Sequence, residues 1–573
     1  MLKKIKENEK LKNNIKFILI MIALTIFASY PYLPEGTVYA HDLCYHFARI
    51  LGTEAEISNG IFPVFIHSNL LDGLGYGNPL FYPELFLYIA ILFMKLGFGV
   101  LFSYKMLLMI TTFCTAMITF YSTNLITKDK KVSWITTLLY TLSLYRFVDI
   151  YARGALGEVL SFTFLPLIIA GLYDILWGEN KRWYLICFAI FGVMNSHVLS
   201  FAMAVILILV LCFINIIRIF KDKKKILNIT IAGIVSILLI SSYMFTYIEQ
   251  KMDDSLNVDV HKNSGQSLKD NASGLQEAFW NDLRNTDGYT TRSVGTLLLI
   301  LPICLFMIKN KKERKEFKFF LELYILGLAV WVMSLNVFPW EKCTFLQIMQ
   351  FPYRLNMIST LLFSFVAGYS VINAFENKED IFKLLILVIL LISAKHLSEV
   401  KLNENGINYE ILMSGPLVAN GEYKPVGFSE DDKEVYSHYK PEDKISFEKK
   451  GSKIMFDYND KENNIDLHIP LTYYKGYVGY IINENGEKID LKLEKDNTNA
   501  HLRIKSDKIM TGKITVEYKM TAVQKCGYAI SIVTFISVIS FIIYKNKKLI
   551  DKNENVNKLK NGKIIRKIVE KVK

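Results

Sequence analysis

The sequence has few cysteines, and their positions do not form pairs. The seven cysteines are scattered along the chain, most of them inside apolar segments. This spacing argues against a disulfide framework and against a zinc site. The chain also lacks the Walker and Rossmann glycine patterns, the HExxH motif and a GxSxG elbow. ATP-driven transport and zinc-dependent proteolysis therefore have no support.

Charge is also sparse for a chain of this length. Charged residues make up 21% of the 573 residues, hydrophobic residues make up 52%, and the mean hydropathy is positive. One soluble core cannot hold so many apolar side chains, so the composition predicts a multi-span membrane protein. The net charge of +13 comes from short Lys and Arg clusters between apolar runs. These clusters indicate membrane topology, and no nucleic-acid partner is expected.

Apolar runs long enough to cross a bilayer predict about twelve spans. The first run follows a lysine-rich start and has no small-residue cleavage site after it, so we expect it to be retained as a span. The predicted spans are centred near 15–32, 104–126, 132–148, 159–177, 183–196, 198–217, 226–248, 292–308, 319–337, 356–374, 381–397 and 525–544.

A further apolar run at 84–100 is predicted not to span. Its uninterrupted part before Lys95 is about 11 residues, or roughly 16 Å of helix, against a hydrocarbon core of about 30 Å. Counting it as a span would also place the downstream basic clusters outside. The positive-inside rule therefore favours a re-entrant or interfacial helix here, with both termini in the cytoplasm.

This topology divides the chain into a membrane domain and a smaller β-rich domain. Residues 1–397 form the polytopic α-helical part, with a long first external loop at 33–103. Residues 398–524 alternate apolar and polar side chains between turn signals such as Asn485-Gly486, which predicts a small extracytoplasmic, sandwich-like β-domain. A last span at 525–544 and a basic cytoplasmic tail at 545–573 follow.

The first external loop opens with three polar residues on one helix face. Asp42, His46 and Arg49 recur at intervals of four and three, while apolar residues take the opposite face. This pattern predicts a helix lying flat at the membrane surface. Asp42 has an alternative interpretation as the N-cap of that helix, although a cap would explain only one of the three residues. His46 could equally be a satisfied interfacial histidine.

The second external loop concentrates charge at the outer membrane surface. Arg146, Asp149, Arg153 and Glu158 lie within a turn or two of that surface and need water, partners or a ligand. They could simply pair with one another, Arg146 with Asp149 and Arg153 with Glu158. Arginines beside acids are also what a lipid-phosphate site requires, since a guanidinium group donates a planar fork to phosphate oxygens.

Arg354 is a further candidate, at the outer end of a predicted span. It follows Gln350 in the stretch "QIMQFPYRL". It could anchor the span at the interface or act as a second phosphate donor.

These motifs resemble a known class of membrane proteins. The stretches "HDLCYHFARI", "GLGYGNPLFYPELFLY", "RGALGEVLSFTFLPL" and "FPYRL" resemble the bacterial membrane proteins labelled "6-pyruvoyl-tetrahydropterin synthase-related", within the GT-C superfamily of membrane glycosyltransferases. The resemblance covers most of 15–400. Nothing in the chain resembles a soluble pterin synthase, so that label is disregarded as a statement of activity. The resemblance implies a GT-C-like fold in the bacterial plasma membrane.

The resemblance also implies an activity and roles for individual residues. It implies transfer of a sugar from a polyprenyl-phosphate-linked donor to a cell-envelope glycan or lipid acceptor on the outer face. Asp42 matches the first-loop acid and would be the general base, while Glu158 takes the place of a second-loop acid. Arg153 or Arg354 would steady the phosphate leaving group. His46 and Arg49 are supporting substrate-binding candidates on the Asp42 helix.

Metal dependence and the function class stay open at this point. The first loop carries a His-Asp pair where several relatives carry two acids, so a divalent cation would have only Asp42 and Glu158 as oxygen ligands. A lipid-linked glycan transporter or flippase is one alternative, but the spans offer few polar residues at mid-membrane. A non-catalytic envelope assembly protein whose β-domain binds glycan is the other.

Overall fold

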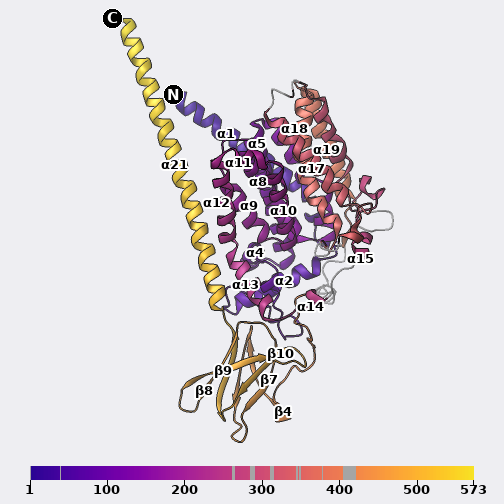
Figure 1. The fold of residues 1–573 in the computed structure, drawn as a ribbon, viewed down its shortest axis with the longest axis vertical. Helices are drawn as coiled ribbons and strands as arrows, with labels where there is room; N and C mark the ends of the chain where they lie inside the picture. Colours follow the sequence, from indigo (N-terminus) through magenta and orange to yellow (C-terminus); the bar gives the residue numbers. More distant parts are fainter. Residues whose placement is uncertain are drawn as a thin grey trace.

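The protein has a helical body with a β-rich domain at one end. The computed structural model describes residues 2–38, 40–260, 265–283, 291–309, 311, 315–343, 346, 350–376, 378–403 and 421–572. Parts of the predicted external loops at 249–291, 338–355 and 398–524 lie outside these residues. Helices α1 (Leu2–Ala28) and α21 (Ala522–Val572) both run to the end of the body opposite the β-rich domain (Figure 1). Helix α21 includes most of the predicted basic tail.

Six helices in the described parts of the chain are long and apolar enough to cross a membrane. A seventh is added if the bent pair α12 (Lys223–Leu239) and α13 (Ser241–Asp253), which meet at 63°, forms one span. The six are Leu11–Ala28 of α1, α5 (Val100–Thr127), α8 (Leu156–Leu176), Pro352–Ala374 with α18 (Asn356–Ala374), α19 (Glu379–Ser398) and Ala522–Lys547 of α21.

The predicted number of about twelve spans is therefore wrong. Apolar composition does not reveal where a helix breaks, and several predicted spans break early. The run at 183–196 forms α9 (Tyr184–Met194), which has 11 residues. Such a helix is about 16 Å long, roughly half of the hydrocarbon core. The run at 132–148 divides into α6 (Lys130–Thr141) and α7 (Leu144–Val148).

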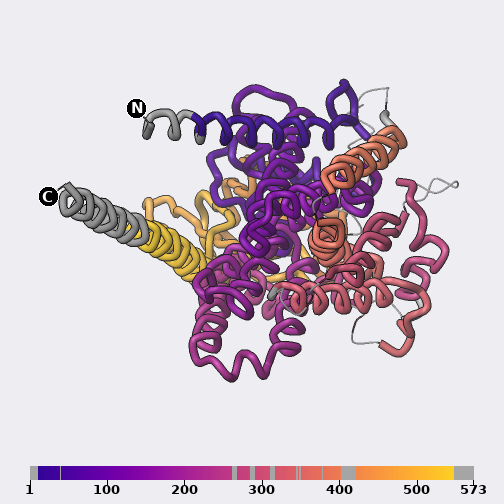
Figure 2. The backbone as a smooth tube through the Cα atoms, turned by 90° about the horizontal axis from the view of Figure 1, so that it is seen from above, coloured from indigo at the N-terminus to yellow at the C-terminus, as the bar shows by residue number. Residues whose placement is uncertain are grey.

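The remaining helices complete the body. The predicted non-spanning run at 84–100 forms α4 (Leu87–Lys95), whose nine residues agree with that prediction. Seen from above, α18 and α19 lie to one side of the helices from the first half of the chain (Figure 2). The other helices are α2 (Leu43–Ser58), α3 (Asn78–Phe81), α10 (Val198–Ile214), α11 (Ile216–Phe220), α14 (Asn257–Val260), α15 (Gly265–Asp270), α16 (Thr296–Ile300) and α17 (Lys315–Met333).

The β-rich domain is one continuous antiparallel sheet of nine strands, in the order β4-β3-β7-β10-β9-β8-β11-β6-β5. It differs from the predicted sandwich because β9 pairs with both β8 and β10 and so joins the two halves edge to edge. The strands are β3 (Val435–Ser437), β4 (Lys440–Ile445), β5 (Glu448–Lys450), β6 (Lys453–Tyr458), β7 (Ile465–Thr472), β8 (Tyr477–Asn483), β9 (Lys488–Lys495), β10 (His501–Ser506) and β11 (Gly512–Tyr518).

The first external loop is packed between the helices and this sheet. Its residues Phe65, Ile66, Leu80 and Phe81 are buried in the same apolar cluster as the strands. A short ladder also pairs β1 (Thr37–Val38) with β2 (Leu402–Asn403), so the start of the loop meets the chain after α19. The loop therefore has packing partners on both sides.

Candidate functional site

Asp42 lies immediately before α2, at the junction of the first and second loops. It occupies the N-cap position, yet its side chain accepts no capping hydrogen bond. Its backbone N–H donates to the carbonyl oxygen of Arg153 at 2.8 Å. Asp42 as a whole residue is accessible to solvent. The second loop therefore holds the backbone of Asp42, and the Asp42 carboxylate forms no capping hydrogen bond with α2.

A glycine allows the second loop to approach Asp42 this closely. Gly154 has φ of 68° and ends a π-helical turn, Asp149–Arg153. A Cβ at this position would lie 3.0 Å from Cβ of Ala40 and 3.3 Å from the backbone nitrogen of Leu43. Glycine suits the left-handed backbone and leaves room for this contact.

Glu158, in the first turn of α8, gathers two arginines. Its Oε1 lies 2.9 Å from NH2 of Arg153 and 3.0 Å from Nε of Arg354. Its Oε2 accepts a hydrogen bond from the hydroxyl of Tyr145 at 3.1 Å. All four side chains are buried or nearly so. With Asp149, they form what we call the arginine–carboxylate cluster.

Asp149 adds a second acid to this cluster. Its Oδ1 forms an ion pair with NH1 of Arg153. Burial raises the pKa of Asp149 well above its usual range, and the charge of Glu158 raises it further, against the effect of Arg153. This favours the protonated acid.

A third arginine lies near the same cluster. The guanidinium carbons of Arg153 and Arg292 lie 5.1 Å and 5.2 Å from the ring centroid of Tyr353. Arg354, the next residue, also donates to the side-chain oxygen of Gln350 at 2.8 Å. Arg153 and Arg292 thus share the Tyr353 ring, while Arg354 lies over the ring of Phe351 at 4.8 Å. Cationic side chains gathered in this way increase the attraction for an anionic group.

The surroundings of Asp42 favour proton acceptance. Burial of this part of the chain raises the pKa of Asp42, and Glu158 raises it further, while Arg153 and Arg354 oppose the rise. A carboxylate with a raised pKa is a stronger base once ionised. Asp42 is thus a candidate proton acceptor within electrostatic reach of two guanidinium groups.

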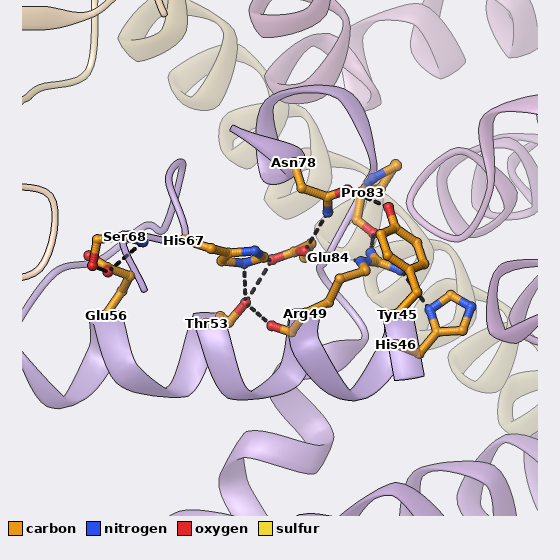
Figure 3. A network of polar contacts seen from close by, with 10 residues as sticks. All are labelled: Tyr45, His46, Arg49, Thr53, Glu56, His67, Ser68, Asn78, Pro83 and Glu84. Atoms are coloured by element: carbon orange, nitrogen blue, oxygen red, sulfur yellow. Dashed lines mark hydrogen bonds and ion pairs between the residues drawn. The ribbon is translucent and has the colours of Figure 1, made fainter. Parts of the chain in front are cut away.

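Three other polar residues of α2, His46, Arg49 and Thr53, take part in a second, buried cluster centred on Glu84 (Figure 3). Oε1 of Glu84 lies 3.1 Å from Nε of Arg49 and accepts from Nδ2 of Asn78 at 3.0 Å. Oε2 accepts from the hydroxyl of Thr53 at 2.7 Å and lies 3.2 Å from Nε2 of His67. Burial alone would raise the pKa of Glu84, but His67 and Arg49 outweigh it and lower the pKa to about 2.

Arg49 and His46 are held inside this second cluster. NH2 of Arg49 donates to the carbonyl oxygen of Pro83 at 2.8 Å, and its NH1 lies 3.1 Å from Nδ1 of His46. The guanidinium also covers the ring of Tyr82 at 4.0 Å. Both residues are 2% exposed. The interpretation of α2 as a helix with its polar face at the membrane surface is therefore wrong, because the first loop covers that face.

The residues present do not fit a divalent cation well. Within the described parts of the chain, no group of three or more His, Cys, Asp or Glu side chains is arranged to hold a metal ion. Both oxygens of Glu158 already face arginine or tyrosine donors. A cation there would have to displace them, so no step of the proposed reaction is assigned to a metal.

A family model described as "Bacterial membrane protein YfhO" matches residues 77–421, more than half of the chain. The chain belongs to the YfhO family. The label "6-pyruvoyl-tetrahydropterin synthase-related" is not confirmed by this match. An uncharacterized protein of Lactococcus lactis subsp. cremoris is 23% identical over 624 aligned positions, covering 94% of this YfhO chain and 96% of its own length.

Solved structures similar to this YfhO chain include an arabinofuranosyltransferase, ArnT and an oligosaccharyltransferase. Mycobacterial arabinofuranosyltransferase AftD is 13% identical with a TM-score of 0.41, over 67% of this chain and 27% of its own. ArnT from Cupriavidus metallidurans bound to undecaprenyl phosphate is 11% identical with a TM-score of 0.36, over 66% and 63%. The Archaeoglobus fulgidus oligosaccharyltransferase is 11% identical with a TM-score of 0.34, over 72% and 61%. The chain spans about a quarter of the length of AftD.

The structure brings some of the predicted site residues together and separates others. Arg153 pairs with Glu158, as the alternative interpretation of the second loop predicted, and Arg354 joins this pair next to Asp42. His46 and Arg49 belong instead to the Glu84 cluster. Arg146 is not paired with Asp149 as considered from the sequence, since its NH1 and NH2 donate to a backbone carbonyl and a threonine hydroxyl.

Sequence reasoning missed Glu84 and Glu422. Glu84 is the single acid in the apolar run "PLFYPELFLYIAILF". An isolated acid in such a run indicates that the folded chain pairs it with a buried partner. Glu422 lies at the start of the β-rich domain, and its carboxylate interacts with Asp42 and Arg354. Nothing in the local sequence around Glu422 indicates this electrostatic interaction.

Proposed function

We propose that this protein is a membrane glycosyltransferase that moves a sugar from a polyprenyl-phosphate-linked donor to a cell-envelope acceptor on the outer face. The observation that carries the proposal is the arginine–carboxylate cluster beside Asp42. It joins a base with a raised pKa to guanidinium groups suited to a phosphate.

In the proposed reaction, the acceptor hydroxyl oxygen attacks the anomeric carbon of the donor sugar. Asp42 takes the hydroxyl proton as the new C–O bond forms. The bond between the anomeric carbon and the phosphate oxygen breaks, and the polyprenyl phosphate leaves with the electron pair. Arg153 and Arg354 stabilise the negative charge that develops on that oxygen.

Glu158 has a positioning role in this proposal, not that of a second base. Its Oε1 contacts both Arg153 and Arg354 and so holds the two guanidinium groups close to each other. The ion pairs also compensate the burial of these charges, since an unpaired buried arginine would be strongly unfavourable.

The proposal is tested in cells that lack the protein. These cells are complemented with the wild type, with Asp42→Asn, or with Asp72→Asn, and lipid-phosphate sugars and envelope sugars are measured. We expect the donor lipid to accumulate and the envelope sugar to disappear in the deletion and Asp42→Asn strains. Asp72→Asn is the matched control, because Asp72 lies in the same loop but is 70% exposed.

The result that contradicts the proposal is a normal envelope sugar level with Asp42→Asn present in the membrane at the wild-type amount. If the envelope sugar disappears when the β-rich domain is deleted but not with Asp42→Asn, a non-catalytic assembly protein is favoured instead.

A further inference from the structure

Arg292 lies near the arginine–carboxylate cluster but has no part in the reaction proposed above. Its backbone N–H donates to Oε1 of Glu277 at 2.9 Å. Its carbonyl oxygen accepts from the hydroxyl of Ser273 at 2.7 Å and from Nδ2 of Asn356, the first residue of α18, at 2.8 Å. Oδ1 of Asn356 in turn accepts from the hydroxyl of Ser334 at 3.0 Å. Three separate parts of the chain therefore hold the backbone of Arg292 in place.

The guanidinium group of Arg292 is also held in one direction. Its NH1 donates to the carbonyl oxygen of Ala272 at 3.1 Å and to that of Asp270 at 3.3 Å. A guanidinium group carries five N–H donors, so bonds from NH1 alone leave donors for a ligand. Arg292 as a whole residue is partly exposed. A ligand can therefore reach this arginine from the solvent.

The ring of Tyr353 brings Arg292 close to the arginine–carboxylate cluster. The guanidinium carbon of Arg292 lies 5.2 Å from the ring centroid, and that of Arg153 lies 5.1 Å from the same centroid. Two guanidinium groups repel each other, but the electron-rich face of an aromatic ring attracts both. Tyr353 thus holds together two cations that would otherwise move apart.

The residues just before Tyr353 arrange a further arginine. The ring of Phe351 stacks on that of Tyr353, with centroids 5.4 Å apart and planes at 13°. The guanidinium carbon of Arg354 lies 4.8 Å from the centroid of Phe351, and NH1 of Arg354 donates to Gln350 at 2.8 Å. Gln350 has φ of 59°, a left-handed conformation that is unfavourable for a residue other than glycine. Three arginines thus depend on one short stretch with a strained backbone.

We propose that Arg292 is a third anion-binding residue of the site and that Tyr353 is the positioning residue that holds it beside Arg153. This inference rests on the proposed function. The phosphate of the donor is a diester with one negative charge. When its bond to the anomeric carbon breaks, the electron pair stays on the phosphate oxygen, and the leaving group is a monoester with a charge of about −1.5 to −2 at neutral pH. Arg292 binds this additional negative charge.

The ion pairs of the cluster explain why this role belongs to Arg292. Arg153 and Arg354 both contact Oε1 of Glu158, so part of their positive charge is already compensated. Among the described residues, no carboxylate forms an ion pair with Arg292. Its charge is therefore available for the leaving group. A cation that gains its partner only as the bond breaks stabilises the transition state more than the bound donor.

Binding of charged probes tests this role without any sugar transfer. The purified full chain in detergent is titrated with radiolabelled farnesyl phosphate, with its methyl diester and with farnesol, which share one apolar chain and differ in charge. We expect the wild type to bind the monoester more tightly than the diester. Arg292→Gln should weaken binding of the monoester about tenfold, the effect of losing one charge-assisted hydrogen bond, and leave the other two probes unchanged.

Two substitutions of Tyr353 test the positioning role. Tyr353→Leu should lose the preference for the monoester in the same way, whereas Tyr353→Phe should retain it, because phenylalanine keeps the aromatic ring. The matched control is Arg218→Gln. Arg218 likewise lies over an aromatic ring, that of Trp177 at 3.2 Å, but it belongs to α11, at the end of the helical body away from α2 (Figure 1). This variant should bind all three probes as the wild type does.

The same titrations separate failure of this inference from failure of the proposed function. The inference is overturned if Arg292→Gln keeps the wild-type preference for the monoester, or if it weakens all three probes equally, which indicates a structural role only. Loss of the preference in Tyr353→Phe overturns the role of the ring. If the wild type binds neither ester more tightly than farnesol, the phosphate site of the proposed function fails. If Arg153→Gln weakens both esters while Arg292→Gln weakens neither, only the role of Arg292 is contradicted.

Discussion

Glu84 links α2 to the later part of the first loop through Arg49 and Thr53. It compensates the charge of Arg49 in a place where both side chains are almost completely buried, at 5% and 2% exposure. Removing one member of a buried pair leaves the other charge without compensation. The helix that begins after Asp42 is therefore positioned by a residue on the far side of the first loop.

We predict that Glu84→Gln lowers the free energy of unfolding by about 3–5 kcal/mol, because the buried Arg49 would lose its counter-charge. The thermal midpoint of the full chain in detergent measures this effect. Glu54→Gln is the matched control, since Glu54 pairs with the half-exposed Lys95 at 2.8 Å, and should change stability by less than about 1 kcal/mol. Equal effects of the two substitutions would contradict the assigned role of Glu84.

His468 in β7 predicts a pH dependence of the β-rich domain. Burial lowers its pKa to about 4, so the folded domain keeps it neutral while the unfolded chain protonates near pH 6.5. The free energy of unfolding of the domain is therefore highest above about pH 6.5. It falls as the pH drops toward 4, by about 3 kcal/mol at most, because protonation of His468 favours the unfolded chain.

Hydrogen exchange of β7 and β10 in the full chain, corrected for intrinsic rates, measures this pH dependence between pH 7.5 and pH 4.5. His468→Gln should weaken it, whereas His438→Gln, on a partly exposed side chain of the same domain, should retain it. Wild-type protection that does not fall with pH would contradict the prediction.

At the scale of elements, the contact between the first loop and the sheet is the feature that positions the site. The backbone N–H of Thr472 in β7 donates to the carbonyl oxygen of Leu74 at 2.8 Å. A Cβ at Gly77 would lie 2.8 Å from the ring of Tyr474. The loop and the sheet thus approach so closely that even a methyl group disturbs them.

We predict that Gly77→Ala destabilises the protein by about 1–3 kcal/mol through overpacking at this contact. Unfolding midpoints and the hydrogen-exchange protection of Thr472 measure the effect. Gly233→Ala in α12 is the control, because no atom lies within 4 Å of the added methyl group. If Gly77→Ala behaves like the control, the loop and the sheet are not packed as described.

Local patterns could predict several elements but not the tertiary partners of single residues. The alternation of apolar and polar side chains predicted the strands, and the short run before Lys95 predicted a helix too short to span. The pair of Arg153 and Glu158 followed from charges close in sequence, whereas Arg354 joins it from a distant part of the chain. The partner of Arg49 could not be predicted, since Glu84 lies 35 residues away and reaches it only through the fold of the loop.

The number of spans was wrong for a related reason. Mean hydropathy depends only on the side chains along a run, whereas a membrane span also needs one continuous helix. The pair α12 and α13 is continuous in apolar character but bends by 63° around Ile240. Nothing in the composition of that run indicates the bend.

At the scale of the whole molecule, the account requires the β-rich domain and the site to face outward. In a cysteine-free background, we predict that Lys508→Cys reacts with a membrane-impermeant maleimide on intact cells, while Lys221→Cys reacts only after lysis. Both positions are exposed, so accessibility depends on the side of the membrane. The reverse labelling pattern would contradict the predicted topology.

Sugar transfer by the purified protein tests the central claim most directly. The full chain is reconstituted in liposomes with polar lipids extracted from cells lacking the protein, which we expect to contain the accumulated donor, and with an envelope fraction from the same cells. We predict that the wild type consumes the lipid-phosphate sugar and attaches it to the envelope fraction, and that Asp42→Asn does neither. Equal transfer by the wild type and Asp42→Asn, or none by the wild type from an extract that contains the donor, would contradict the account.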